Sequence, residues 1–370
     1  SLVRKDIEYI YTDHGMTSFH LMLQENALDH FDTIFCYGPN HMREVRETER
    51  VYGLPPKTLV KTGFPLLDSM IAGAEAIRHV SNDPKIILIA PSWQQDNILE
   101  YCLEETLRPL LSAGYRVVLR PHPEFIKRFP VKMKQIIDDY KDETGKNLEI
   151  QTSFASNTTV YSADLVITDW SSIANEFSYA TKKPSLFINT PMKVMNPNYK
   201  KIPLVPLDIS LRDEIGVSID TDQLGTLPDV VSDLFDRADW FKNHIEDVVR
   251  NNIFDVGDGA RGGGEYIVEA LKKREKKAGE ESGSRAHSRG AAVLDDVKQE
   301  EAGPPLFAEY ARRWQNLARC QQQCESVFDA ILNQPLSPEE LAQKTKGQWM
   351  REIMEELEEK TGAKEQRDEI

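Results

Sequence analysis

Short apolar segments, each followed by a turn rich in Gly, Pro or Ser and then by a helical pattern, recur along the first 200 residues of the chain. Residues 86–90 and 165–168 are two examples, and both consist almost entirely of aliphatic or β-branched side chains. Runs of this length are typical of buried strands, and strands that alternate with helices pair in parallel within a layered sheet. The sequence therefore predicts an α/β protein built on doubly wound parallel sheets.

Residues 1–80 contain three of these strand patterns, at residues 9–12, 33–37 and 58–62, with a helical pattern at residues 40–52. Three parallel βα units are too few for a complete layered sheet. We therefore expect residues 1–80 to be the C-terminal part of an N-terminal domain whose first part is truncated.

A second series of patterns fills residues 84–271 and predicts a complete doubly wound domain. The expected strands lie at residues 86–90, 115–119, 148–152, 165–168 and 185–188, and the expected helices at residues 97–113, 128–143, 158–162, 222–250 and 262–277, with one more directly after Ser172. Ligands of such sheets bind beyond the carboxyl ends of the strands. Polar residues at those ends are therefore the first candidates for a site.

The last hundred residues differ in composition from the rest. Residues 272–304 are rich in Lys, Glu, Ser and Gly, which predicts a disordered linker. Residues 305–370 have a helical pattern, with Ser337-Pro338-Glu339-Glu340 as a helix start signal. We expect a helical extension there, and recruitment of a protein partner through residues 305–370 is one role that it could have.

Charge is distributed unevenly along the chain. The 45 Lys and Arg residues against 60 Asp and Glu residues give a formal net charge of −15, which by itself disfavours nucleic acid and anionic membranes as partners. Residues 1–200, however, carry 22 basic and 25 acidic side chains, and residues 115–134 carry six basic side chains and one acid. The first half of the chain is therefore compatible with a ligand that contains phosphate.

Two further features concern the cellular setting. No apolar run reaches the roughly 18 to 20 residues that a membrane-spanning helix needs. The four cysteines, at positions 36, 102, 320 and 324, show no metal-ligand spacing, which argues for a reducing compartment and against a zinc site. We expect a cytoplasmic protein without a bound metal.

The segment Arg120-Pro121-His122-Pro123 follows the strand expected at residues 115–119. Its two prolines exclude regular structure, and it places an arginine and a histidine at the carboxyl edge of the sheet. Such a loop fits a diphosphate clamp, in which the imidazole donates a hydrogen bond to a phosphate oxygen. Arg120 and His122 are therefore candidate phosphate-binding residues.

A second candidate segment, Asp169-Trp170-Ser171-Ser172, lies between an expected strand and an expected helix. Hydroxyl groups and unpaired backbone N–H groups at a helix N-terminus suit a phosphate anion, although a serine N-cap alone would explain Ser171 and Ser172 equally well. Glu176, one turn into the helix, fits either a ribose-binding carboxylate or an acid that is stabilised by the helix dipole.

The segment Asp13-His14-Gly15 is the counterpart in the first domain. The glycine allows the backbone to turn sharply near a ligand, and a histidine can take a proton from an attacking hydroxyl at neutral pH. A surface histidine at a strand end is the alternative interpretation of His14.

The order of these motifs resembles the CDP-glycerol glycerophosphotransferase family of teichoic-acid synthesis. The resemblance covers about residues 8–270 and rests on five motifs with Lys183-Pro184 downstream of them: Asp13-His14-Gly15, Thr62-Gly63-Phe64-Pro65-Leu66-Leu67-Asp68, Ala90-Pro91-Ser92-Trp93, Leu119-Arg120-Pro121-His122-Pro123, and the segment from Ala163 to Ser172. Five motifs in this order are far more specific than any one of them.

The resemblance implies a GT-B arrangement of two Rossmann-like domains, residues 1–80 on the acceptor side and residues 84–271 on the nucleotide side. It also implies transfer of glycerol phosphate, or of a related polyol phosphate, from a CDP-activated donor to a hydroxyl group of a lipid-linked or polymeric acceptor, with release of CMP. His14 would be the catalytic base, and His122 would act in catalysis and in binding. Nucleotide or pyrophosphate binding would involve Ser92, Arg120, His122, Asp169, Ser171, Ser172 and Glu176.

No cofactor is demanded, because Arg, His and a helix N-terminus can stabilise charge on the phosphoryl oxygens and on the CMP leaving group. The expected location is the cytoplasm, at the inner face of the cell membrane. Two alternatives stay open: a GT-B glycosyltransferase that uses a nucleotide sugar, and a binding module without catalytic activity.

Overall fold

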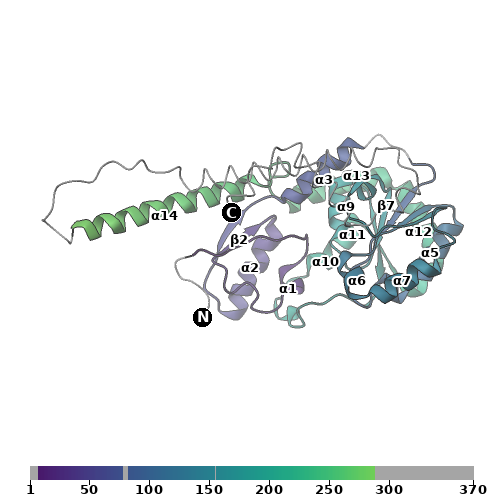
Figure 1. Ribbon diagram of the computed structural model, residues 1–370, viewed down its shortest axis with the longest axis horizontal. Helices are drawn as coiled ribbons and strands as arrows, with labels where there is room; N and C mark the ends of the chain where they lie inside the picture. Colours follow the sequence, from purple (N-terminus) through teal and green to yellow (C-terminus); the bar gives the residue numbers. More distant parts are fainter. Residues whose placement is uncertain (1–6, 78–81, 155, 288–370) are drawn as a thin grey trace, which may run out of the picture. The chain divides into compact units, whose positions relative to one another are not determined.

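The computed structural model describes residues 7–77, 82–154 and 156–287, and these residues all belong to one compact unit, Ser1–Ser288 (Figure 1). Both predicted α/β domains lie within this unit. The predicted extension at residues 305–370 and the linker from residue 288 onward lie outside the described residues.

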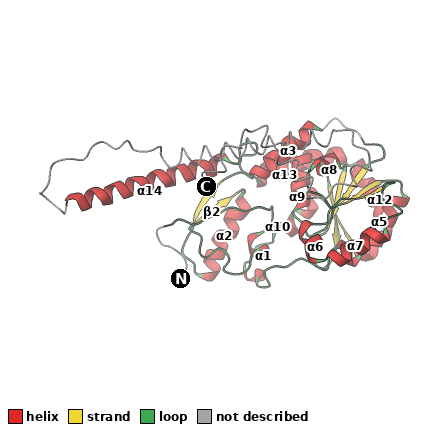
Figure 2. Cartoon of the chain, in the orientation of Figure 1, coloured by secondary structure: helices red, strands yellow, loops and turns green. Residues whose placement is uncertain are grey.

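The elements alternate between strand and helix along the chain, as Figure 2 shows. The strands are β1 (Ile10–Tyr11), β2 (Thr33–Cys36), β3 (Thr58–Lys61), β4 (Ile86–Ile89), β5 (Arg116–Leu119), β6 (Leu148–Ile150), β7 (Leu165–Thr168), β8 (Ser185–Asn189) and β9 (Gly216–Asp220). The helices are α1 (Phe19–Met22), α2 (Pro39–Tyr52), α3 (Pro65–Ala76), α4 (Ile98–Tyr101), α5 (Leu103–Ser112), α6 (Pro123–Arg128), α7 (Pro130–Asp139), α8 (Thr158–Ser162), α9 (Ile173–Thr181), α10 (Leu207–Ser210), α11 (Arg212–Ile215), α12 (Leu227–Asp236), α13 (Ala238–Asn252) and α14 (Arg261–His287), with 3-10 turns at Tyr199–Lys201 and Thr221–Thr226.

Two parallel sheets form the framework. The first has the order β1-β2-β3, and the second has the order β6-β5-β4-β7-β8-β9. Within the second sheet the chain runs outward from β4 to β6 and then from β7 to β9, which is the strand order of dinucleotide-binding domains. The predicted α/β class with Rossmann-like, doubly wound sheets is thereby confirmed.

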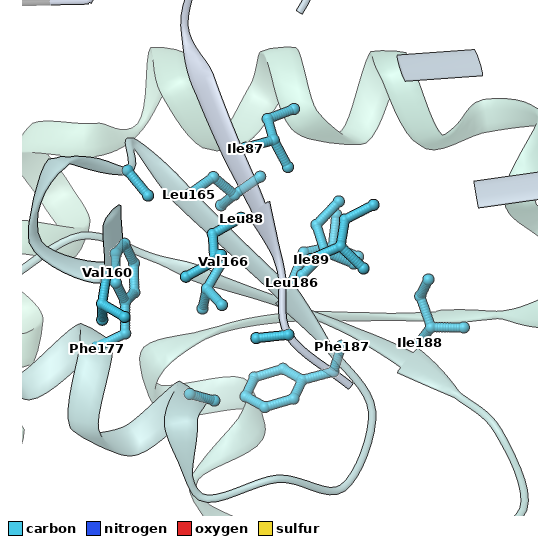
Figure 3. Close-up of a cluster of buried hydrophobic side chains, with 14 of the residues drawn as sticks. Ile87, Leu88, Ile89, Val160, Leu165, Val166, Phe177, Leu186, Phe187 and Ile188 are labelled. Carbon is cyan, nitrogen blue, oxygen red and sulfur yellow. The ribbon is translucent and has the colours of Figure 1, made fainter. Parts of the chain in front are cut away.

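The core of the second domain lies on its central strands. All four residues of β4 and of β7 are buried, which matches their unbroken apolar sequences. Figure 3 shows Leu88, Val166 and Leu186 from adjacent strands together with Val160 of α8 and Phe177 of α9. Helices α3, α9, α11 and α13 gather on one side of this sheet, and α5, α7 and α12 on the other (Figure 1).

The chain segment after β1 is bound to the second domain by hydrogen bonds. Asn175 Nδ2 donates to the carbonyl oxygen of Met16 at 2.8 Å, and the Ser18 amide donates to Asp208 Oδ2 at 2.8 Å. Further along, Asn196 Nδ2 donates to the His20 carbonyl oxygen at 2.9 Å. Because His14 immediately precedes this segment, its backbone position relative to the second sheet is fixed by these contacts.

A second connection lies where the chain returns from α13 to the first domain. Both carboxylate oxygens of Asp68 accept backbone N–H groups, from Gly257 and Gly259, at 2.7 Å each. The Gly63 amide donates to the Gly259 carbonyl oxygen at 3.0 Å. A Cβ on Gly63 would lie 2.3 Å from the Gly259 Cα, so only glycine fits at this crossing. The motif at residues 62–68 therefore binds the segment that leads from α13 back to the first domain.

Several features differ from the sequence predictions. Helix α6 begins directly at Pro123, although the two prolines of residues 120–123 predicted no regular structure, because Pro is tolerated at the first position of a helix. The helix predicted at residues 222–250 is divided into a 3-10 turn, α12 and α13. Strand β9 was not predicted, and the helix predicted at residues 97–113 is divided at Cys102, whose φ of −158° and ψ of 34° interrupt the helix. Residues 272–287, predicted as the start of a disordered linker, continue α14. Lys, Arg, Glu and Ala are strong helix formers, and the pair Glu269–Lys273 has the favourable i,i+4 order, which explains the longer helix.

The close crossing at Gly63 generates a stability prediction. We expect Gly63→Ala to lower the free energy of unfolding by about 1–3 kcal/mol, because the added methyl group meets backbone atoms that cannot rotate away. Gly225→Ala is the matched control, since a Cβ there meets nothing within 4 Å. Urea unfolding of both variants measures the difference, and equal stabilities would show that the crossing is not tightly packed.

Candidate functional site

A pocket of about 480 Å³ opens where loops from both domains meet. Its walls follow the carboxyl ends of six strands, β1 in the first domain and β4, β5, β6, β7 and β8 in the second. The lining residues used below are Asp13, His14, Gly15, Trp93, Arg120, His122, Phe154, Ser171, Ser172, Glu176 and Lys193. This is the edge at which doubly wound sheets bind their ligands.

Six residues predicted from the sequence line this one pocket, although they are far apart in the chain: His14, Arg120, His122, Ser171, Ser172 and Glu176. The two domains are in close contact at this point. A Cβ on Gly15 would lie 3.7 Å from Ser172 Oγ, which places the loop of His14 directly beside the serine loop.

The His122 ring is held in one orientation by the backbone of the next helix. His122 is the N-cap of α6, and its Nδ1 accepts the amide of Glu124 at 3.1 Å. Burial and the neighbouring charge of Lys193 lower the pKa of His122 below its ordinary value. The imidazole is therefore neutral at pH 7, and its only proton sits on Nε2, which makes Nε2–H a hydrogen-bond donor.

The His14 side chain is 99% exposed, so it is open to a second substrate. Its backbone is shaped by Asp13, whose Oδ1 accepts the His14 amide at 2.8 Å and the Gly15 amide at 3.4 Å. The same oxygen lies 3.8 Å from His14 Nδ1. An exposed imidazole in this position can accept a proton from a hydroxyl group of that substrate.

Ser172 and Glu176 act together at the start of α9. Ser172 occupies the N-cap position, but its hydroxyl donates to Glu176 Oε1 at 3.0 Å and does not cap the helix. Burial raises the pKa of Glu176, while the hydrogen bond from Ser172 and the charge of His14 oppose that rise. Glu176 is thus a partly buried hydrogen-bond acceptor on the pocket wall.

Arg120 lines the pocket, but its hydrogen bonds serve another purpose. The guanidinium donates to Gln151 Oε1 at 2.9 Å, to the Ser156 carbonyl oxygen at 3.1 Å and to Asn157 Oδ1 at 3.0 Å. It also lies 5.1 Å from the ring centre of Phe154. Arg120 therefore shapes the loop that carries Phe154 to the pocket, whereas the sequence predicts a direct diphosphate contact.

Two predicted binding residues do not line this pocket. Ser92 and Asp169 are each 1% exposed and bind one another, with the Ser92 amide 2.7 Å from Asp169 Oδ1 and the Ser92 hydroxyl 3.2 Å from Oδ2. The Trp170 amide also donates to Asp169 Oδ1 at 2.7 Å. Both side chains join the loops after β4 and β7. We therefore interpret Ser92 and Asp169 as residues that support the fold of the site.

Four of the six basic side chains at residues 115–134 pair with acids, either on other elements or, for Glu124, within helix α6 itself. Arg116 pairs with Glu149 at 3.3 Å, and Lys132 pairs with Glu100 at 3.3 Å. Arg128 and Lys127 both pair with Glu124. Of the six basic residues counted in this stretch, only Arg120 lines the pocket. The local charge excess in the sequence therefore overstates the positive charge at the site.

Phe154 and Lys193 are lining residues that the sequence analysis did not single out, and Trp93 appeared there only within the motif at residues 90–93. Lys193 lies four residues beyond the end of β8, at the same sheet edge as the predicted residues, and this position was the available signal. Phe154 has a comparable place after β6. Among the described residues, no group of three His, Cys, Asp or Glu side chains could hold a metal ion, and no helix is long and apolar enough to cross a membrane.

Comparison with known families identifies the family to which the chain belongs. Residues 4–194 match the family described as CDP-Glycerol:Poly(glycerophosphate) glycerophosphotransferase, and this match covers more than half of the chain. The chain belongs to this family. It is accordingly a CDP-glycerol glycerophosphotransferase-like enzyme, and its two domains, each built on a parallel sheet, both contribute residues to the pocket.

Solved structures of several proteins are also similar to this glycerophosphotransferase family member. A variant of the wall teichoic acid polymerase TagF with CDPG is 15% identical, with 75% of this chain and 69% of that chain covered and a TM-score of 0.49. TagF itself is 16% identical, with 75% and 70% covered and a TM-score of 0.44. UDP-GlcNAc 2-epimerase of Methanocaldococcus jannaschii, in complex with UDP-GlcNAc and UDP, is 14% identical, with 66% and 62% covered and a TM-score of 0.42. A search of curated proteins finds no significant match.

The orientation of His122 can be tested by nitrogen-15 NMR of the imidazole. We expect the proton of the neutral ring on Nε2 and a titration midpoint below the ordinary value of about 6.5, because burial and Lys193 both disfavour the charged form. The spectrum of His122→Asn assigns the signal. A proton on Nδ1, or a midpoint above 6.5 in the free protein, would contradict this geometry.

Proposed function

We propose that this enzyme transfers glycerol phosphate, or a related polyol phosphate, from a CDP-activated donor to a hydroxyl group of a cell-surface polymer or of its lipid-linked precursor, with release of CMP. Family membership supports the donor class. The observation that carries the proposal is the pocket that His14 of the first domain lines together with His122 and Ser172 of the second.

The proposed reaction is a displacement at phosphorus. The acceptor oxygen forms a bond to the β-phosphorus of the donor, and the bond from that phosphorus to the oxygen bridging the two phosphates breaks. CMP leaves with the electron pair, and the acceptor proton passes to the exposed imidazole of His14. Nothing is oxidised or reduced, and no metal step is required by this balance.

The second domain is suited to hold the donor. The His122 Nε2–H can donate to a phosphoryl oxygen, and a neutral donor in a partly buried site stabilises the charge that develops there. Glu176 can accept hydrogen bonds from hydroxyl groups of the donor, since its carboxylate is partly buried on the wall beside Ser172. The nucleotide would then lie along the carboxyl ends of β4, β5 and β7.

We place the reaction in the cytoplasm, because the proposed donor is a cytidine nucleotide. The enzyme would meet a lipid-linked acceptor at the inner face of the membrane. A second role, recruitment of a protein partner, concerns residues 305–370, which lie outside the described residues.

The donor class can be tested with a panel of nucleotides. We expect CDP-glycerol or CDP-ribitol to raise the melting temperature of the full chain more than UDP-sugars do at equal concentration, because a ligand that binds only the folded state stabilises it in proportion to its affinity. Differential scanning fluorimetry measures the shifts. A larger shift with a UDP-sugar would instead favour a glycosyltransferase with a nucleotide-sugar donor.

The role of His14 can be tested by its replacement with asparagine. We expect His14→Asn to lower kcat for CMP release by about 10²- to 10⁴-fold with little change in donor affinity, since the variant removes the proton acceptor and leaves the donor pocket intact. His30→Asn is the control, because His30 is an exposed histidine of the same domain outside the pocket. Unchanged turnover in His14→Asn would remove His14 from the mechanism.

A further inference from the structure

Lys193 is a buried cation on the wall of the donor pocket. It lies in the segment between β8 and α10, and only 9% of its surface is exposed. Burial lowers the pKa of its ammonium group, which is the expected response of a charge removed from water. Its charge in turn acts on His122, so the two groups are neighbours on the same wall.

No hydrogen bond or ion pair joins Lys193 Nζ to any other residue that the structure describes, across residues 7–77, 82–154 and 156–287. Buried lysines are normally paired, because a charge that is removed from water without a partner costs several kcal/mol. Lys193 is therefore an unpaired charge at the pocket wall, where a ligand could provide the missing anion.

The two nearest acids already have other partners. Asp208 and Asp169 both favour the charged form of Lys193 through space, but neither pairs with it among the described residues. Asp208 accepts the Ser18 amide at 2.8 Å, and Asp169 accepts the amides of Ser92 and Trp170. Their carboxylates are held by these backbone donors.

An aromatic ring holds the ammonium group at the pocket. Lys193 Nζ lies 4.8 Å from the ring centre of Trp93, and the Arg128 guanidinium lies 4.6 Å from the same centre. A cation–π contact stabilises a cation without neutralising it. The charge of Lys193 is thus positioned beside His122 and stays available to an anion.

We infer that Lys193 is a further donor-binding residue, whose ammonium group pairs with a phosphate of the nucleoside diphosphate beside the Nε2–H of His122. This inference rests on the proposed function and adds a residue that the motifs of the sequence did not indicate. A lysine in this place supplies a full positive charge, whereas His122 supplies a neutral hydrogen bond. The pair would neutralise the bound diphosphate from one side.

The arrangement has a testable thermodynamic signature. A lysine that served only the fold would stabilise the free protein, but an unpaired buried charge lowers its stability until the ligand binds. We therefore expect Lys193→Met, which keeps the length and the apolar stem of the side chain, to leave the melting temperature of the free protein unchanged or raised. The same variant should lose affinity for ligands that carry phosphate.

Affinity is measured for CDP-glycerol and CDP by calorimetry and for cytidine by ligand-observed NMR, in the full chain. We expect Lys193→Met to weaken binding of both phosphate-containing ligands by about 10- to 100-fold, the effect of losing one hydrogen bond to a charged group, with cytidine affinity unchanged. Lys193→Arg should bind CDP more tightly than Lys193→Met does, since it keeps the charge.

Two further measurements separate binding from structure. Lys200→Met removes the same charge from an exposed lysine of the same segment and should change none of these affinities. In Lys193→Met the titration midpoint of His122 should rise, because a repelling cation is lost while Glu124, the other charged group acting on His122, remains. If Lys193 served only the fold, its replacement by Met would not raise the titration midpoint of His122 and at the same time leave the stability of the free protein unchanged.

The outcomes distinguish this inference from the proposed function. Equal affinity of wild type and Lys193→Met for CDP-glycerol, or an equal loss of affinity for cytidine, would overturn the role of Lys193. If another nucleoside diphosphate compound ranks first with the wild-type protein, the donor assignment is wrong, and the same comparison with that compound decides the role of the lysine.

Discussion

The buried carboxylate of Asp169 holds together the loops on which the site is built. It accepts the amides of Ser92, Trp170 and Ile98 and the hydroxyls of Ser92 and Thr190, so that the chain after β4, the chain after β7 and the chain after β8 meet at one anion. Burial raises the pKa of Asp169, and these hydrogen bonds oppose that rise. If one of these buried donors lost its partner, the free energy of unfolding would fall by about 1–3 kcal/mol.

This anchor lies at the point where the strand order of the second sheet reverses, between β4 and β7. The loops diverge there, and the pocket opens above them. The segment from Met16 to Leu21 is bound to the second domain by Asn175, Asn196 and Asp208, which brings the loop of His14 over the same edge. A buried anchor and a bound segment thus place groups from two domains around one volume. Lys193, whose charge has no hydrogen-bond or ionic partner among the described residues, lines the same pocket.

The sequence predicted the class of fold and the edge of the site because both follow from local patterns. Buried strands such as residues 86–89 and 165–168 are recognisable from their apolar runs, and a doubly wound sheet places its ligand at their carboxyl ends. Strand β9 escaped prediction because it is an edge strand in which only Gly216 and Ile219 are buried. Its five residues, Gly-Val-Ser-Ile-Asp, do not form the apolar run by which the central strands were recognised.

The remaining differences depend on contacts between distant residues. The partners of Arg120 lie 31 to 37 residues away, and those of Asp169 lie in three separate loops, so no local pattern could show that these side chains serve the fold. The unpaired state of Lys193 is likewise a property of the packed structure. Sequence motifs therefore located the site. Only the tertiary contacts show which of its residues are available to a ligand and which support the fold.

The most direct test of this account is a crystal structure of the protein with CDP bound. The account predicts that the diphosphate lies in the pocket between the two domains, with a phosphate oxygen at about 2.7–3.2 Å from His122 Nε2 and with Glu176 and Ser172 on the adjoining wall. A nucleotide whose diphosphate lies outside this pocket, for example in the groove formed by α3, α9 and α13, would contradict the assignment of the site.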